Sequence, residues 1–157
     1  MSENEQWPWS GDILVIVRDA KTGRFRPGTR RFKNLITNAG KNLIRDTLGG
    51  FVSDTKIRYL GVGTSNTAVA ATDTQLGAEN MRKAATAYDN TVGTGAHKTT
   101  TYLAPGEANI SIQELGWFAT ASATASANSG VMIAHVLYNH TKTSGESISV
   151  QRTDTFS

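Results

Sequence analysis

Short segments in which apolar and polar residues alternate follow one another closely along this chain, and they limit the folds open to it. The alternation is clearest in residues 146–156, where Ile148 and Val150 lie on one side of the segment and Ser147 and Ser149 on the other. A period of two residues is typical of a β-strand with one buried face. We therefore expect a strand here, with a clearly apolar face only in its first half.

Further strands are predicted between clusters of turn-forming residues. They are expected at residues 11–19, 30–36, 56–63, 80–88, 97–105, 108–119 and 130–139. The segment AKTGRFRPGTR, between the first two, contains the glycines and proline of a turn, so these two strands are expected to form a hairpin. Several short strands with few helices are typical of antiparallel β folds. We predict a mainly β protein, an antiparallel β-sandwich or barrel-like domain.

One short helix is predicted near residues 38–48. Thr37 or Asn38 is suited to cap its start, and Gly49 and Gly50 are suited to end it. The apolar residues that recur near helical spacing are Ile36, Leu43, Ile44 and Leu48. We expect this apolar stripe to cover the open face of a sheet.

Size and composition indicate one globular domain. The chain has 157 residues, of which 38% are hydrophobic and 18% charged, a balance unlike that of a disordered chain. The absence of cysteine excludes disulfides and thiolate metal ligands. No apolar run approaches the roughly 20 residues that span a bilayer. The start, MSENEQWPWSG, is acidic and polar where a signal peptide would be basic and then apolar, so we expect an intracellular product.

The positive charge of the chain is concentrated in one segment. Nine cations and one anion lie between Arg18 and Arg45, a net charge of +8, whereas the remaining residues carry −5. Such a segment can bind nucleic acid. However, no row of aromatic residues interleaves the cations and no DNA-binding helix pattern follows them. We favour the alternative, in which a basic end and an acidic end suit copies or partners that meet head to tail.

The sequence GVG at residues 61–63 resembles part of a glycine-rich nucleotide loop. A dinucleotide fingerprint needs a third glycine, where this chain has Asn66, and a P-loop needs a lysine that is missing here. We therefore expect Gly61 and Gly63 to let the chain turn sharply out of a strand. No bound cofactor is expected.

The titratable residues give no catalytic pattern. His97, His135 and His140 form no close pair on a helix face, and His135 is interpreted as a hydrogen-bonded core histidine. Glu107 and Glu114 could pair as acid and base. The alternative for Glu114, which stands beside core aromatic residues, is that it fixes a turn or binds backbone amides. We predict no catalytic residues, no metal site and no enzymatic activity.

Four motifs in a fixed order give the chain a resemblance to a known group. They are LITNAGKNLIRDTLGG, IRYLGVGTSNTAVAATDTQLGAENMRKAAT, ISIQELGWFA and GVMIAHVLYNHTKTSGESISV. This order resembles a module of tailed-bacteriophage structural proteins, which recurs at the base of tail-fibre and collar proteins and in small virion proteins. The resemblance covers roughly residues 34–156.

The resemblance implies scaffold roles, with no catalytic residues among the matched positions. The matching residues are Asn38, Gly40, Gly61, Gly63, Thr64, Asp73, Thr74, Leu76, Glu79, Arg82, Glu114, Gly116, Trp117, Lys142, Thr143 and Glu146. Lys41, Asn66 and Ala68 depart from the pattern of the module. By their spacing, Asp73 can cap a turn, and Glu79 with Arg82 can form an ion pair.

The expected function is therefore structural. The resemblance implies a multi-copy virion component, assembled in the host cytoplasm, that docks at the neck, tail or baseplate or decorates the head. The chain ends at the module without a shaft or receptor-binding head, which favours a small appendage or adaptor. Its expected partners are other virion proteins and copies of itself, with no membrane. The alternatives are a carbohydrate-binding adhesin that uses Trp7, Trp9 or Tyr102 and, less favoured, a nucleic-acid binder.

Two regions are predicted within the single compact domain. Residues 1–33 are expected to form an N-terminal arm and basic hairpin, and residues 34–157 the β-sandwich module. Because the first region lies outside the matched module and holds most of the excess charge, we expect it to dock onto partners. The predicted assembly surface consists of Trp7, Trp9, Arg24, Arg26, Arg30 and Arg31.

Overall fold

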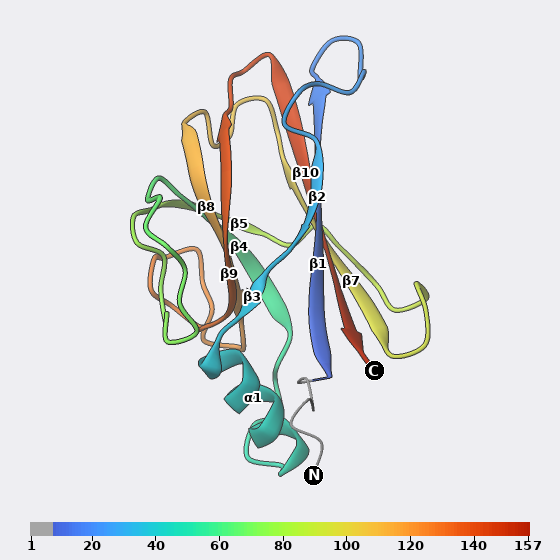
Figure 1. Ribbon diagram of the computed structural model, residues 1–157, viewed down its shortest axis with the longest axis vertical. Coiled ribbons are helices and arrows are strands. Elements are labelled where there is room, and N and C mark those ends of the chain that lie inside the picture. Colours follow the sequence, from blue (N-terminus) through green and yellow to red (C-terminus); the bar gives the residue numbers. More distant parts are fainter. Residues whose placement is uncertain (1–7) are drawn as a thin grey trace.

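The computed structural model describes residues 8–157, which form ten strands and one α-helix (Figure 1). In chain order these are β1 (Trp9–Asp19), β2 (Arg30–Lys33), β3 (Leu35–Ile36), α1 (Asn38–Leu48), β4 (Ile57–Gly63), β5 (Glu79–Ala84), β6 (Ala87–Asp89), β7 (Ala96–Leu103), β8 (Ser111–Ala119), β9 (Val131–Thr141) and β10 (Glu146–Phe156). The predicted strands are confirmed within three residues at their ends, although residues 30–36 and 80–88 are each divided between two strands.

The strands form two five-stranded antiparallel sheets. One sheet has the order β2-β1-β10-β7-β6 and the other the order β3-β9-β8-β4-β5. The predicted β-sandwich is thereby confirmed. In the described part of the chain the sheets do not join into a closed barrel, so of the two predicted forms the sandwich is the correct one.

On each of the two sides of the sandwich, one segment of the chain passes from one sheet to the other. β2 pairs with β1, and after Asn34 the same segment continues as β3 and pairs with β9. On the opposite side β5 pairs with β4 and β6 pairs with β7. The turn between them keeps its backbone bonded, because the Ala85 amide donates to Arg58 and the Thr86 amide to Thr100. Strands that switch sheets in this way make the corners of a sandwich.

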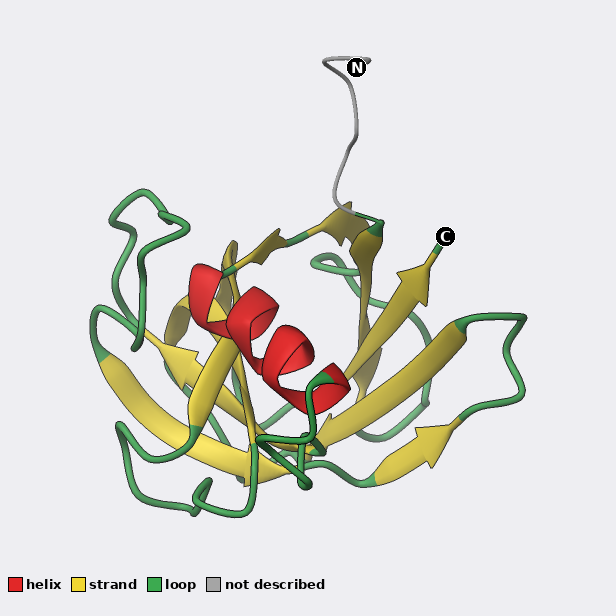
Figure 2. Ribbon diagram, turned by 90° about the horizontal axis from the view of Figure 1, so that it is seen from below, coloured by secondary structure: helices red, strands yellow, loops and turns green. Residues whose placement is uncertain are grey.

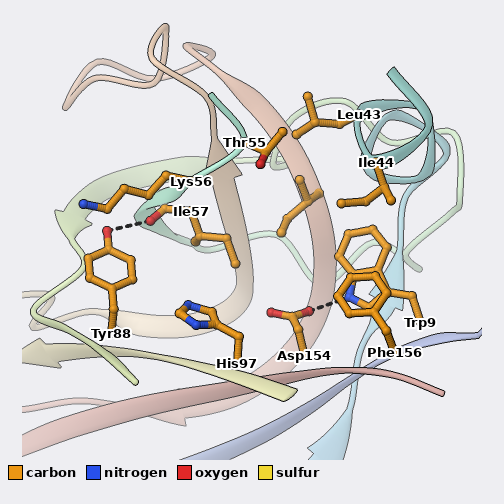
Figure 3. Close-up of a pocket in the computed structure, with 11 residues that line it drawn as sticks. Trp9, Leu43, Ile44, Thr55, Lys56, Ile57, Tyr88, His97, Asp154 and Phe156 are labelled. Atoms are coloured by element: carbon orange, nitrogen blue, oxygen red, sulfur yellow. Dashed lines mark hydrogen bonds between the residues drawn. The ribbon is translucent and has the colours of Figure 1, made fainter. Parts of the chain in front are cut away.

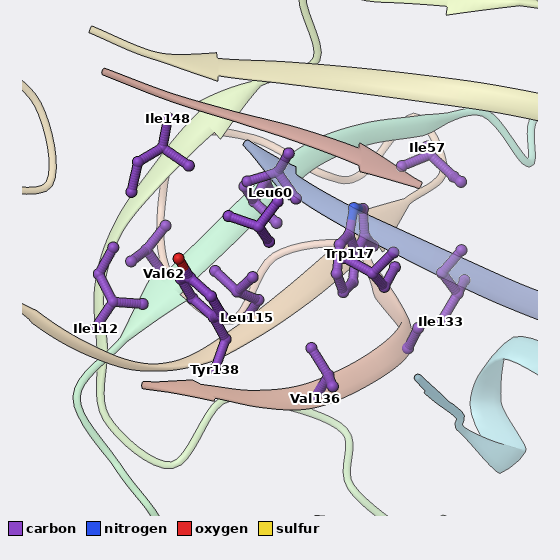
Figure 4. Close-up of a cluster of buried hydrophobic side chains, with 14 of the residues drawn as sticks. Ile57, Leu60, Val62, Ile112, Leu115, Trp117, Ile133, Val136, Tyr138 and Ile148 are labelled. Atoms are coloured by element: carbon purple, nitrogen blue, oxygen red, sulfur yellow. The ribbon is translucent and has the colours of Figure 1, made fainter. Parts of the chain in front are cut away.

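The core lies between the inner faces of the two sheets (Figure 4). In β1 alternate residues are buried, and Ile13, Val15 and Val17 have no exposed surface. In its sheet the hairpin strand β1 is an interior strand, flanked by β2 and β10. Trp117 of β8 is the largest fully buried side chain. The β1–β2 hairpin is confirmed, and its first strand is part of the core.

The helix α1 begins where predicted and lies across one end of the sandwich (Figure 2). Thr37 is the N-cap, and its hydroxyl accepts a hydrogen bond from the Gly40 amide. Gly40 lies so close to β9 that a Cβ there would be 2.6 Å from the Ile133 carbonyl oxygen. We expected the helix to cover a sheet face. Because the sheets already pack on each other, it closes their end instead.

In the second half of β10 the charged side chains of Arg152 and Asp154 are buried and form an ion pair. Arg152 has no exposed surface, and its Nε lies 2.9 Å from Asp154 Oδ2. The guanidinium also lies 5.2 Å from the centre of the Trp117 ring. Buried charges persist in proteins when they are paired and hydrogen-bonded in this way. This pairing lets β10 continue through the sandwich after its apolar face ends.

Candidate docking surfaces

Three of the predicted docking cations lie exposed on the β1–β2 hairpin. Arg24 is in the connecting loop, at the upper end of Figure 1, and Arg30 and Arg31 are in the edge strand β2. Among residues 8–157 none of the three takes part in a salt bridge, and Arg30 lies over the Phe32 ring at 5.1 Å. These three residues, named the basic edge below, leave their charge available to a partner.

Arg26 is bound within the molecule. Its guanidinium lies 3.7 Å from Glu146 and 3.8 Å from Asp19, and it donates a hydrogen bond to the Gly145 carbonyl at 3.1 Å. It therefore ties the hairpin to the turn between β9 and β10. Arg26 is therefore less available to a partner than the other three predicted arginines, although its side chain is 39% exposed.

The Trp9 side chain is buried at one end of the sandwich. Only 6% of its surface is exposed, its indole nitrogen donates to Asp154 at 2.7 Å, and its ring stacks on Phe156 at 5.5 Å. Its burial removes it from both predicted roles, as a docking anchor and as a sugar-stacking residue. Trp7 lies outside the described residues, and Tyr102 is 43% exposed on β7.

The predicted assembly surface is thus divided by the length of β1. Trp9 begins this strand of 11 residues, and Arg24 lies in the loop beyond its far end. A strand rises about 3.3 Å per residue, so the two residues are separated by roughly 33 Å or more. Sequence proximity suggested one surface, but the extended strand carries its parts to opposite ends of the molecule.

An apolar pocket of about 500 Å³ lies beneath α1 at the Trp9 end (Figure 3). Its walls come from α1, from the start of β4, from β6, β7 and β9, and from the ends of β1 and β10. The apolar side chains among its lining are Trp9, Leu43, Ile44, Ile57, Ile133 and Phe156.

Three polar side chains of this pocket, those of Tyr88, Asp154 and His97, are bonded within the protein. The Tyr88 hydroxyl donates to the Ile57 carbonyl at 2.6 Å, and burial raises the pKa of this phenol. Asp154 accepts from Trp9 and Arg152, and His97 bonds Thr99. The pocket therefore offers mainly shape and apolar surface to whatever enters it.

Exposed apolar side chains surround this end of the molecule. Leu48 and Phe51 are each 86% exposed, and Phe156 and Tyr88 are 43% and 40% exposed. Leu48 lies one helical turn beyond the pocket residue Ile44, on the same face of α1. Large apolar side chains grouped on a surface are typical of interaction sites. We name Leu48, Phe51 and Phe156 with the pocket the apolar end.

The buried histidine His135 lies between two carboxylates. Its Nδ1 is 2.8 Å from Asp73 Oδ2, and its Nε2 is 2.8 Å from Glu114 Oε2. The prediction of a hydrogen-bonded core histidine is confirmed. A histidine that activates a serine must turn one ring nitrogen toward the nucleophile. Here both ring nitrogens face carboxylates.

Glu114 also binds backbone amides, as one of its two interpretations predicted. Its carboxylate accepts from the amides of Ala78 at 2.8 Å and Gly77 at 3.0 Å. Glu107 lies elsewhere and bonds Lys83 and the Ala104 amide; the Lys83 ammonium is the main cause of its lowered pKa. The two carboxylates therefore do not form the acid–base pair considered as the alternative.

Gly61 and Gly63 lie within β4, and the prediction of a sharp turn at these residues was wrong. Neither has a positive φ. Instead, a Cβ on Gly61 would lie 2.7 Å from the Phe118 ring, and one on Gly63 would lie 2.7 Å from the Ala78 carbonyl oxygen. Glycine is needed at both positions because neighbouring side chains and backbone approach the strand closely from the side.

Two further buried charges hold long connections in place. The predicted Glu79–Arg82 ion pair is confirmed at 2.8 Å, and Arg82 also donates to the carbonyls of Thr124 and Ser129 in the β8–β9 connection. Lys142 is 2% exposed and donates to the carbonyls of Ala104 and Pro105 and to Asn109 Oδ1. Burial lowers the pKa of this lysine.

Glu114, Arg82 and Lys142 are named the clamp residues below. The resemblance marked them as scaffold, but the loop groups that they hold, such as Gly77, Ser129 and Asn109, lie 33 to 47 residues away in sequence. No local pattern signals contacts over such separations. The apolar end was likewise missed, because its walls come from segments spread over the whole chain.

No protein-family model matches this chain, and no curated protein or solved structure matches it either. Within residues 8–157, no three or more histidine and acidic side chains are placed to hold a metal ion. The one described helix is too short to cross a membrane.

Proposed function

We propose that this protein is a non-enzymatic structural component of a tailed-bacteriophage particle, present in several copies and docked on other virion proteins. Its place is at the neck, tail or baseplate, where the fibre and collar proteins that it resembles lie, in preference to the head surface. It reaches the virion by assembly in the host cytoplasm. The basis is the order of the four motifs in residues 34–156.

The observation that carries the proposal is the shared role of the clamp residues. Each belongs to a motif of the resemblance, and each fixes one long connection against the sheets. Glu114 holds residues 64–78, Arg82 holds the β8–β9 connection and Lys142 holds the β7–β8 connection. The motifs thus produce a rigid body with fixed loops, as an assembly component requires.

The basic edge is the docking surface of this proposal. Exposed arginines form bidentate contacts with carboxylates, so an acidic face on another virion protein suits them. Charge on such a surface mainly steers the encounter and fixes the register of the bound partner. Arg24 lies in the hairpin loop, and Arg30 and Arg31 are neighbours in β2, where successive side chains point to opposite faces, so a partner binds around this edge.

The test is incorporation into particles. A variant with Arg24→Glu, Arg30→Glu and Arg31→Glu should fold with nearly unchanged melting temperature, because these side chains are exposed. Its copy number in purified virions, measured by quantitative mass spectrometry, should fall at least about tenfold, as expected when complementary charge becomes repulsive. The matched control replaces the same three residues by lysine; it keeps the charge but loses the bidentate contacts, so its copy number should lie between those of the wild type and the glutamate variant.

Two outcomes contradict this proposal. Normal incorporation of the folded glutamate variant would place the docking surface elsewhere. Absence of the wild-type protein from purified particles would overturn the virion role itself.

A further inference from the structure

We propose that copies of this protein bind each other by exchange of their N-terminal segments, with Trp7 of one copy seated in the apolar pocket beneath α1 of another. The inference specifies the multi-copy part of the proposed function. The inference is based on the pocket, on the place where the described chain begins, and on the charges of the N-terminal segment and of the pocket.

The pocket suits one large aromatic side chain. Its volume is about 500 Å³, within the range of roughly 300–1,000 Å³ found for ligand sites. Trp9 and Phe156 supply aromatic walls, while Ile44 and Ile57 supply aliphatic ones. The hydrogen bonds of Tyr88 and Asp154 are made internally, so an incoming ring need not satisfy them.

The N-terminal segment starts at the mouth of this pocket. The Pro8 carbonyl accepts a hydrogen bond from the Ser157 amide at 2.9 Å, and the next residue, Trp9, forms part of the pocket wall. Seven residues precede Pro8, and seven extended residues reach roughly 23 Å. This reach is sufficient to enter a second copy whose apolar end faces the first.

A second copy is favoured over the pocket of the same chain, because two copies that face each other at their apolar ends also cover the exposed side chains Leu48 and Phe51. Two copies that face each other can exchange segments reciprocally across a two-fold axis.

Surface apolarity and charge agree with this arrangement. Facing copies would cover Leu48 and Phe51, which are otherwise 86% exposed. The segment carries Glu3 and Glu5, and the receiving pocket has Lys56 in its wall. Opposite charges at the rim of an interface guide the encounter, and a buried aromatic residue supplies most of the affinity.

Association of the purified full-length protein, measured by analytical ultracentrifugation over a range of concentrations, tests the inference. Wild-type protein should form a reversible dimer. Trp7→Ala and the pocket-filling Ile44→Trp should each weaken association at least about tenfold, the loss expected for a central aromatic contact. Asn42→Trp places the same side chain on an exposed position of α1 and should associate as the wild type does. Thermal unfolding verifies that every variant is folded.

Mixing provides the decisive measurement. Trp7→Ala copies keep an open pocket and Ile44→Trp copies keep their segment, so a mixed dimer retains one of the two exchanged contacts. It should therefore form more strongly than the dimer of either variant alone. A wild-type monomer, a dimer unaffected by Trp7→Ala or the lack of a mixed dimer would each overturn the inference. A monomer whose melting temperature falls on Trp7→Ala would show that the segment fills its own pocket. These measurements use purified protein without virions, so failure of this inference can be distinguished from failure of the proposed virion role.

Discussion

Glu114 stabilises the longest connection of the molecule through one buried carboxylate. Its oxygens accept hydrogen bonds from Gly77 and Ala78, and the His135 ring bonds it from the other side. Buried amides without an acceptor are costly, so this one side chain satisfies donors that the sheets cannot reach. The same carboxylate excludes a side chain at Gly63, where a Cβ would meet it.

The first prediction concerns Glu114→Gln, which keeps the shape of the side chain and replaces one acceptor oxygen by a donor group. The NH₂ group would face amides or the His135 ring, so the free energy of unfolding should fall by about 2–3 kcal/mol. Urea unfolding measures this change. Glu107→Gln is the matched control, since its pair with Lys83 is about one-third exposed and should contribute less than about 1 kcal/mol. Equal effects of the two substitutions would contradict the clamp role of Glu114.

At the scale of elements, short segments determine how the two ends of the sandwich differ. The helix α1 closes one end and shapes the apolar pocket, and its position depends on its first turn. Thr37 has no exposed surface; it accepts from the Gly40 amide and donates to the Met132 carbonyl at 2.6 Å. The N-cap therefore also attaches the helix to β9.

The second prediction concerns this attachment. Thr37→Val keeps the volume but removes both hydrogen bonds, so the protein should lose about 1–2 kcal/mol of stability, as for other N-caps. Thr47→Val removes a single bond to the Leu43 carbonyl in the last turn and serves as the control, with a smaller expected loss. Thermal unfolding followed by circular dichroism compares the two. A larger loss for Thr47→Val would mean that the start of α1 does not secure the helix.

For the whole molecule, the sandwich separates two surfaces with different chemistry. The loop of the β1–β2 hairpin, which carries part of the basic edge, lies at one end of the molecule, and α1, which carries part of the apolar end, lies at the other (Figure 1). Residues 30–36 and 79–89 bridge the sides between them. A body with distinct ends suits an assembly in which copies join through one end and a partner binds the other.

The third prediction concerns stability against acid. Burial by itself raises the pKa of Asp73, but its bonds from the Ala70 amide and the His135 ring outweigh this and lower the pKa below the ordinary value of 3.8. A carboxyl group with a lowered pKa in the folded protein stabilises it above its ordinary pKa, and this contribution disappears as the pH falls through the lowered value. The free energy of unfolding should therefore decline below about pH 4.

Asp73→Asn tests the source of this decline. The variant should be less stable at pH 7, and its difference from the wild type should shrink as the pH approaches 3, because the wild type then loses the same charge. Urea unfolding at several pH values measures both curves. Parallel curves would mean that Asp73 does not contribute to the acid sensitivity.

The sequence by itself determined the local structure of this protein. The two-residue period of 146–156 predicted β10, the caps around 38–48 predicted α1, and the surroundings of Glu114 predicted a carboxylate that binds amides. These features depend on neighbouring residues, since side-chain period, capping and ion pairs three residues apart are local properties. Fold class followed because many short strands with one helix have few ways to bury their apolar faces.

Only the tertiary structure decided which distant groups meet. Trp9, expected to be a docking anchor, is a pocket wall instead: its ring stacks on Phe156, and Asp154, 145 residues away, accepts its indole hydrogen. The sequence predicted one strand at residues 30–36, but these residues form strands in two sheets, since their partners β1 and β9 belong to different layers. Periodicity reports which face of a segment is apolar. Which element covers that face is set by long-range packing, and that packing also forms the pocket and separates it from the basic edge.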